Sequence, residues 1–223
     1  MEKICKYRLK LKKFKELSFI SHLDWQNLIL KIFRRCNLNL VLSCGFNKMP
    51  KVSYSPALPI FIESSCELVN FQTYEPVKDN FKEDFEKFSP NGVELVEIKE
   101  IDENNDEPKS LENYCQWAQY EAILKKDIYN EEKIRYIIEK CLSSNEILIT
   151  KKTKKGIEKT INYRNSLKTL EFKDGVIAFI LKVGQSGEIP SLRADEFLKT
   201  IFENSNLFKI KRVKFFDAFN NVI

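Results

Sequence analysis

The sequence predicts an α+β protein made of two ferredoxin-like (βαββαβ) antiparallel sandwiches in tandem. Segments that alternate apolar and polar residues, typical of strands, are interleaved with segments whose apolar residues recur at helical spacing. This series occurs twice along the chain. An acidic, polar segment broken by a proline, residues 102–110, separates the two series. We therefore expect one domain at 1–104 and a second at 105–223.

The first half contains four expected strands and two expected helices. The strands are expected at 3–14, 39–43, 67–73 and 93–101, and the helices at 22–36 and 77–88. The first helix has the clearest start, because Ser21 and Asp24 can each accept a backbone N–H of its first turn. Six apolar residues share its inner face: Trp25, Leu28, Ile29, Ile32, Phe33 and Cys36.

The second half repeats this order with one additional strand. Strands are expected at 114–123, 146–150, up to Tyr163, 175–183 and 208–216, and helices at 131–141 and from Ser191 or Leu192 to Phe202. A basic hairpin at 151–156 joins two of these strands. No internal repeat is visible at the level of individual residues.

Charge is distributed unevenly along the chain. Lys and Arg outnumber Asp and Glu by 12 to 4 in residues 1–64 and by 15 to 8 in residues 151–223, whereas residues 65–150 carry 10 against 20. A chain of this kind can present a positive face to an anionic partner such as nucleic acid. The alternative is compositional drift toward Lys, Asn and Ile.

The loop at 44–51 is the main candidate for a binding site. Gly45 permits a positive φ and Pro50 cannot donate a ladder hydrogen bond, so the segment is expected at the surface. With a strand at 39–43 running back along the first helix, we expect the loop to lie beside His22. A rigid connector is the alternative. The candidate ligand- or RNA-binding residues are Ser21, His22, Asp24, Arg34, Arg35, Gly45, Phe46, Asn47, Lys48, Lys51, Ser53, Tyr54, Lys154, Lys155 and Arg164.

Residues suited to catalysis are few. His22 is the one histidine, and a structural role or a ligand contact fits it better than acid–base chemistry. The six cysteines lack the paired spacing of zinc or iron–sulfur sites, and the six glycines form no phosphate-binding loop. We expect no catalytic residue, no metal and no cofactor. A long apolar run and a signal peptide are also missing, which predicts a cytoplasmic protein without membrane contact.

Several motifs resemble a bacterial family, the radical-SAM-linked domain of unknown function. They are FISHLD at 19–24, the arginine pair at 34–35, CGFN followed by a PK pair at 44–51, PALP at 56–59 and ES-x-x-E at 63–67. Members of that family are fused to a B12-type radical SAM protein or encoded as its partner. The C-x-x-x-C-x-x-C motif of a radical SAM enzyme is not in this sequence, so the resemblance implies the partner role.

Three functions remain open from the sequence. The first is a non-catalytic partner of a radical SAM protein that presents structured RNA, such as tRNA or rRNA. The second is a pure protein–protein adaptor for the radical SAM subunit. The third is an RNA-processing enzyme that uses His22 as acid or base.

Overall fold

The computed structural model describes residues 4–101, 110–125, 129–152 and 156–223. The chain forms two compact units, Met1–Tyr114 and Cys115–Ile223. The boundary expected between residues 104 and 105 lies outside the described residues, as does most of the expected linker at 102–110. Within the part of the chain that is described, no helix is long and apolar enough to cross a membrane.

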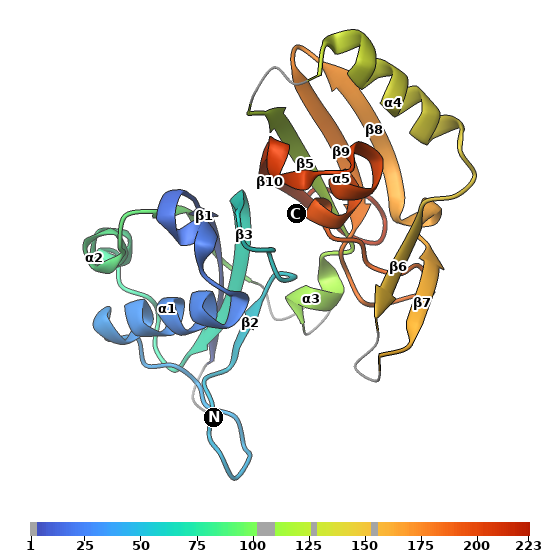
Figure 1. The fold of residues 1–223 in the computed structure, drawn as a ribbon. Helices are drawn as coiled ribbons and strands as arrows, with labels where there is room; N and C mark the ends of the chain where they lie inside the picture. The colour runs from blue at the N-terminus through green and yellow to red at the C-terminus, as the bar shows by residue number, and fades with distance from the viewer. Residues whose placement is uncertain (1–3, 102–109, 126–128, 153–155) are drawn as a thin grey trace. The chain divides into compact units, whose positions relative to one another are not determined.

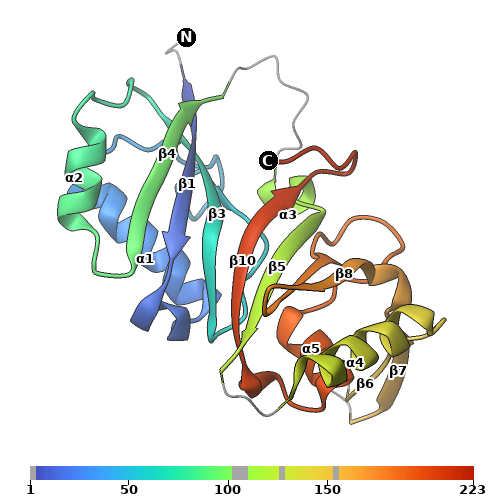
Figure 2. The same ribbon diagram turned by 90° about the horizontal axis from the view of Figure 1, so that it is seen from above.

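The first unit contains one antiparallel sheet and two main helices. Its elements are β1 (Cys5–Lys13), α1 (His22–Arg35), β2 (Val52–Tyr54), β3 (Ile62–Thr73), α2 (Phe81–Phe88), β4 (Val93–Glu100) and a short α3 (Leu111–Tyr114). β1 pairs with β4 on one edge and with β3 on the other, and β2 pairs with the far edge of β3. All of these pairs are antiparallel, and β4, β1 and β3 lie side by side in Figure 2.

Both main helices of the first unit lie on the same side of its sheet (Figure 1). The sequence of β1 alternates between apolar and polar residues, because Tyr7, Leu9 and Leu11 face these helices and pack in the core. Phe71 of β3 lies at the centre of the core, with its ring centroid 4.8 Å from that of Phe33 on α1. Four of the six residues expected on the inner face of α1 are buried, and Leu28 and Cys36 are half-buried.

The strand expected at 39–43 is wrong, because the strand that follows α1 is β2 at Val52–Tyr54. Residues 39–43 form only isolated bridges, from Leu40 to Thr73 and from Leu42 to Pro50. The reason is competition for one edge of β3: Val52 to Tyr54 pair with residues 69–71 of that edge, which leaves its last residues for Leu40 and Val41.

The second unit is built on the antiparallel strand order β10-β5-β9-β8. Its elements are β5 (Trp117–Leu124), α4 (Glu131–Ser143), β6 (Leu148–Lys152), β7 (Glu158–Asn162), β8 (Leu167–Lys173), β9 (Val176–Lys182), α5 (Ala194–Phe202) and β10 (Phe208–Phe216). β6 and β7 form a separate two-stranded ribbon. In the core, the ring of Phe179 on β9 packs between Tyr120 and Phe197, at centroid distances of 5.6 and 5.1 Å.

The sequence analysis missed β8. The two strands expected at 146–150 and up to Tyr163 are instead the ribbon β6–β7, which lies outside the main sheet. β8 enters the sheet through a two-residue turn to β9, in which Asp174 and Gly175 both have positive φ, 50° and 77°. The coarser expectation, a mixed α+β protein with a mostly antiparallel sheet, is confirmed.

Candidate functional site

The first turn of α1 is fixed by a capping pair. The Ser21 hydroxyl accepts a hydrogen bond from the Asp24 backbone N–H at 3.1 Å and donates one to the Asp24 carboxylate at 2.7 Å. The Ser21 cap was expected, but the Asp24 carboxylate accepts this hydroxyl proton. The pair also sets the orientation of His22, the first residue of the helix.

His22 lines a pocket of about 480 Å³ in the first unit. The imidazole Nε2 lies 2.9 Å from the side-chain nitrogen of Gln26, one turn along α1, and its ring meets that of Tyr54 edge-on at 6.3 Å. The Tyr54 hydroxyl donates to the Gln26 carbonyl at 3.2 Å. Burial raises the pKa of Tyr54 well above its usual value, so the phenol stays protonated at neutral pH.

The remaining walls of the His22 pocket come from the segment after β2 and from α3. The pocket is lined by His22, Gln26, Val52, Ser53, Tyr54, Ser55, Ala57, Ser110 and Glu112. Ser53 is already engaged, because its hydroxyl accepts the Leu111 backbone N–H at 2.9 Å. Imidazole, amide, hydroxyl and carboxylate groups therefore surround one small cavity, a lining suited to a polar ligand group.

A buried carboxylate lies behind the Ser55 wall of this pocket. Glu67 is only 1% exposed, and its Oε2 accepts a hydrogen bond from the Ser55 hydroxyl at 3.1 Å. The same hydroxyl accepts the Leu68 backbone N–H at 3.2 Å. The Ser55 backbone N–H also donates to the Leu68 carbonyl at 3.0 Å, so three hydrogen bonds to β3 order the wall next to Tyr54.

The loop at 44–51 is a surface hairpin. The Ser43 N–H donates to the Met49 carbonyl at 2.8 Å, and the Met49 N–H donates to the Ser43 hydroxyl at 3.1 Å. Residues 44–49 are all exposed, and Phe46 is 104% exposed, as much as in an extended chain. Figure 1 shows this light-blue segment projecting away from α1 and the sheet. Gly45 does not adopt the positive φ that was the reason to expect glycine there.

The structure divides the expected site residues of the first unit into two groups. His22, Ser53 and Tyr54 share the pocket at the start of α1, whereas Arg34 and Arg35 lie at its other end, roughly 20 Å along the axis. Residues 44–51 are not among those that line the pocket at His22. β2 itself, and not the loop, brings the chain back to His22, because the strand is at 52–54 and not at 39–43.

The expected site residues of the second unit fall into two cases. Arg164 caps α4, since its Nε donates to the Ser144 carbonyl at 3.0 Å and its Nη2 reaches the Leu142 carbonyl at 3.5 Å. Lys154 and Lys155 lie outside the described residues. Sequence motifs also did not indicate Gln26, Ser55 or Glu112, because isolated polar residues carry no signal without the fold that collects them.

The cysteines show no arrangement for metal binding or for disulfides. All six are free thiols, and four of them are buried. No group of three or more His, Cys, Asp or Glu residues within the described ranges could hold a metal ion. Burial, with a smaller contribution from the charge of Asp84, raises the pKa of Cys36 to about 11, so this thiol is protonated at neutral pH.

Comparison with solved structures finds 23 matching chains. The "Crystal Structure of a Cbf5-Nop10-Gar1 Complex" contains a chain that is 12% identical, with a TM-score of 0.41 over 94% of the present chain and 48% of the other. The present chain thus spans about half the length of that one. No curated protein matches the sequence.

Comparison with protein families gives a match over most of the chain. Residues 6–193 match the family described as "Uncharacterized protein conserved in bacteria (DUF2344)". The match includes the His22 pocket, the loop at 44–51 and the whole of α4. The chain therefore belongs to this bacterial family.

Proposed function

We propose that the chain is a non-catalytic, RNA-binding partner of a radical SAM protein and presents structured RNA, such as tRNA or rRNA, to it. The observation that carries the RNA half of this proposal is the hairpin at 43–51. The Phe46 side chain is fully exposed at its tip, and a backbone hydrogen bond between Ser43 and Met49 closes the base of the hairpin. An ordered loop with an exposed ring suits stacking on an unpaired base, which is the usual way to bind single-stranded parts of RNA.

Basic residues near this loop supply the contacts to phosphate. Lys48 and Lys51 belong to the loop and are exposed. The loop enters β2 at Val52, which pairs with Phe71, and the Phe71 ring packs on Phe33 in the last turns of α1. The exposed side chains of Arg34 and Arg35 belong to the same end of α1. The exposed ring and these four cations supply groups for stacking on a base and for contacts to phosphate.

The radical SAM half of the proposal is supported by the sequence motifs. The FISHLD and CGFN segments resemble the domain linked to B12-type radical SAM proteins, and in this structure the first contributes His22 to its pocket and the second belongs to the exposed hairpin. We assign the pocket to binding, because its lining combines imidazole, amide, hydroxyl and carboxylate groups that suit a polar ligand.

We also propose that both units are ferredoxin-like sandwiches in tandem. In each unit the connectivity is strand, helix, strand, strand, helix, strand, once the ribbon β6–β7 is set aside. In each, the first strand is flanked by the fourth and the third, and the second pairs with the third. This order supports a shared ferredoxin-like plan.

The RNA proposal is tested by fluorescence anisotropy with labelled tRNA at several salt concentrations. The variants are Phe46→Ala, the double variant Arg34→Glu/Arg35→Glu, and the matched double charge reversal Lys87→Glu/Lys99→Glu on exposed residues of α2 and β4. The arginine variant should bind more weakly, and its salt slope should fall by roughly 0.7 to 0.9 for each lost phosphate contact. Phe46→Ala should lose about 1–3 kcal/mol of binding free energy with an unchanged slope.

Two results would contradict this proposal. The first is equal binding by the wild type and both site variants. The second is an equal loss in the lysine control, which would show that the net charge of the unit and not this surface governs binding.

The radical SAM half of the proposal is tested by chemical crosslinking of the tagged chain in its native bacterium, which should recover a radical SAM protein. The variant Leu23→Glu changes an exposed residue of the FISHLD segment and should reduce the yield of that protein. Recovery of crosslinked proteins without any radical SAM peptide would count against the partnership.

A further inference from the structure

We propose that the second unit has a separate binding site for a phosphorylated nucleoside, in the pocket between α4 and the end of α5. This inference goes beyond the RNA proposal, because it depends on the second unit alone. The pocket measures about 480 Å³, within the range of roughly 300–1,000 Å³ usual for small-molecule sites. It is lined by Tyr129, Lys133, Tyr136, Ile137, Lys140, Cys141, Ser144, Glu146, Ile147, Leu148, Thr200, Ile201, Phe202 and Glu203.

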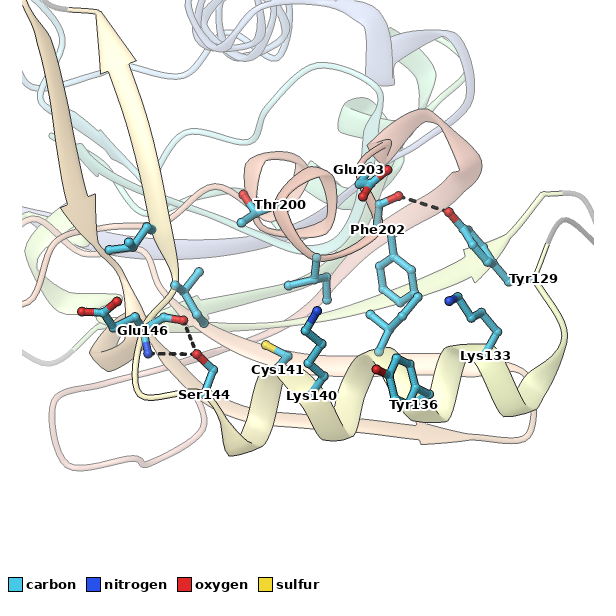
Figure 3. Close-up of a pocket in the computed structure, with 14 residues that line it drawn as sticks. Tyr129, Lys133, Tyr136, Lys140, Cys141, Ser144, Glu146, Thr200, Phe202 and Glu203 are labelled. Carbon is cyan, nitrogen blue, oxygen red and sulfur yellow. Dashed lines mark hydrogen bonds between the residues drawn. The ribbon is translucent and has the colours of Figure 1, made fainter.

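One wall of this pocket is cationic and aromatic. Lys133, Tyr136 and Lys140 follow one another at helical spacing on α4, and Figure 3 shows both lysine side chains rising from the helix toward the end of α5. All three side chains are exposed, and the Lys133 ammonium lies 5.4 Å from the centre of the Tyr136 ring. Lys133 and Lys140 are seven residues apart, which is roughly 10 Å along the helix axis. Their flexible side chains can therefore both contact one phosphate group or each contact a separate one.

The floor of the pocket is apolar. Phe202 and Ile147 are buried there, and Ile137 and Ile201 are half-buried. Tyr129 is held over the end of α5, because its hydroxyl donates to the Phe202 carbonyl at 3.3 Å, as the dashed line in Figure 3 shows. An aromatic and aliphatic floor offers no polar contacts to an inorganic ion, but the flat face of a base can pack against it.

The third wall supplies hydrogen-bond acceptors. α5 ends at Phe202, and Glu203 follows in the left-handed conformation at φ 64°. The Glu203 carboxylate and the Thr200 hydroxyl belong to residues that line this end of the pocket. Nucleobases carry ring and exocyclic N–H groups that such acceptors bind. A fatty acid would use the floor and the lysines and leave the acceptors without donors, whereas phosphate alone would use the lysines only. A phosphorylated nucleoside uses all three walls.

The experiment is methyl NMR of the full chain labelled at the isoleucine δ1 position. GMP, AMP and UMP should shift the signals of Ile137, Ile147 and Ile201 and leave those of Ile29 and Ile32, in the core of the first unit, unchanged. The double variant Lys133→Glu/Lys140→Glu should weaken nucleotide binding about tenfold or more. The control Lys173→Glu/Lys199→Glu has the same change in charge on exposed residues of the same unit outside the pocket, and it should bind as the wild type does.

Two further measurements distinguish a free nucleotide from a nucleotide within RNA, and a failure of this proposal from a failure of the RNA proposal. Shifts with the mononucleotides assign the site to a free nucleotide, and shifts with a single-stranded hexaribonucleotide alone assign it to an unpaired residue of RNA. No shift with either, or equal shifts with inorganic phosphate, would overturn the proposal. Phe46→Ala should leave these shifts intact, so a failure of the loop to bind RNA is distinguished from a failure of this pocket.

Discussion

The two units differ most in the segment between the first helix and the second strand of the sheet. In the first unit this segment covers residues 36–51 and ends in the exposed hairpin with Phe46. In the second it covers residues 144–166 and contains the ribbon β6–β7. The second of these segments is rich in lysine and the first is not, although the strands and helices around them follow the same order. The two units therefore differ in this connection while the order of the surrounding strands and helices is the same.

The units also place their pockets differently. The His22 pocket lies beside the start of the first helix and uses β2 as a wall, whereas the pocket of the second unit lies between the two helices. The strand that follows the first helix also differs in length between the units. β2 has three residues and contacts the start of α1 through Tyr54, whereas β8 has seven residues and packs against α4.

The largest expected effect separates two cysteines of the first unit. Cys44 is exposed in the hairpin, whereas burial raises the pKa of Cys36 to about 11. At pH 8 only about one in a thousand Cys36 thiols is ionised, so Cys44 should react with a disulfide reagent more than about a hundredfold faster. Stopped-flow labelling should show one fast thiol, which Cys44→Ser removes. A fast phase that survives this substitution would show that the connecting segments are not ordered as described.

A second prediction compares a turn from each unit. Gly92, before β4, has φ 102°, and a Cβ there would lie 2.6 Å from the Phe14 carbonyl oxygen, whereas a Cβ on Gly175 meets nothing within 4 Å. Gly92→Ala should therefore cost about 3 kcal/mol or more in free energy of unfolding, and Gly175→Ala about 1 kcal/mol. Urea denaturation measures both. Equal losses would mean that strain, and not the close approach to Phe14, decides the cost.

The third prediction tests a likeness between the units. In each, the first helix has a side-chain cap: Ser21 accepts from the Asp24 N–H, and Asn130 accepts from the Lys133 N–H at 2.9 Å. Ser21→Ala and Asn130→Ala should each cost about 1 kcal/mol. Asn80 precedes α2 without such a bond, so Asn80→Ala should cost less. Thermal unfolding of the three variants gives the ranking, and a larger loss for Asn80→Ala would reverse it.

The smallest effect concerns an ion pair found in the second unit. Lys151 of β6 lies 2.7 Å from Glu196 of α5. Burial lowers the pKa of Lys151, but hydrogen bonds and charges from Glu196 and Tyr163 outweigh it and raise the pKa overall. The stabilisation is therefore present below the ordinary lysine pKa of about 10.4 and is lost as the pH rises through the raised value. Lys151→Gln should cost a few tenths of a kcal/mol at pH 8, and this cost should shrink as the pH rises through the raised pKa; a pH-independent cost would point to lost packing.

The parts of the fold that local patterns dictate could be predicted. β10 begins at Phe208 and ends at Phe216, as the sequence analysis expected, and α1 begins at His22 because Ser21 and Asp24 determine its first turn. β8 was missed although Asp174-Gly175 is a strong hairpin signal, since the preceding LKTLEFK is mostly polar on its outer face. Competition between residues 39–43 and 52–54 for one edge of β3 is a tertiary effect that no local pattern contains.

The candidate sites were predictable to a smaller extent. His22, Ser53 and Tyr54 were selected for their chemistry and do share a pocket. Gln26 and Ser55 could not be predicted as site residues, because only their hydrogen bonds to residues distant in the sequence place them in the pocket wall. The pocket of the second unit was not expected at all, because its lysines and tyrosines are ordinary residues of an exposed helix face until α5 is placed opposite them.

The attachment of the ribbon β6–β7 has a mechanical consequence. At one end of the ribbon, Arg164 binds carbonyl oxygens of the last turn of α4, and along its length Lys151 binds Glu196 on α5. The ribbon is thus tethered to both helices that flank the pocket of the second unit. Any widening of the gap between α4 and α5 must stretch one tether or tilt the ribbon.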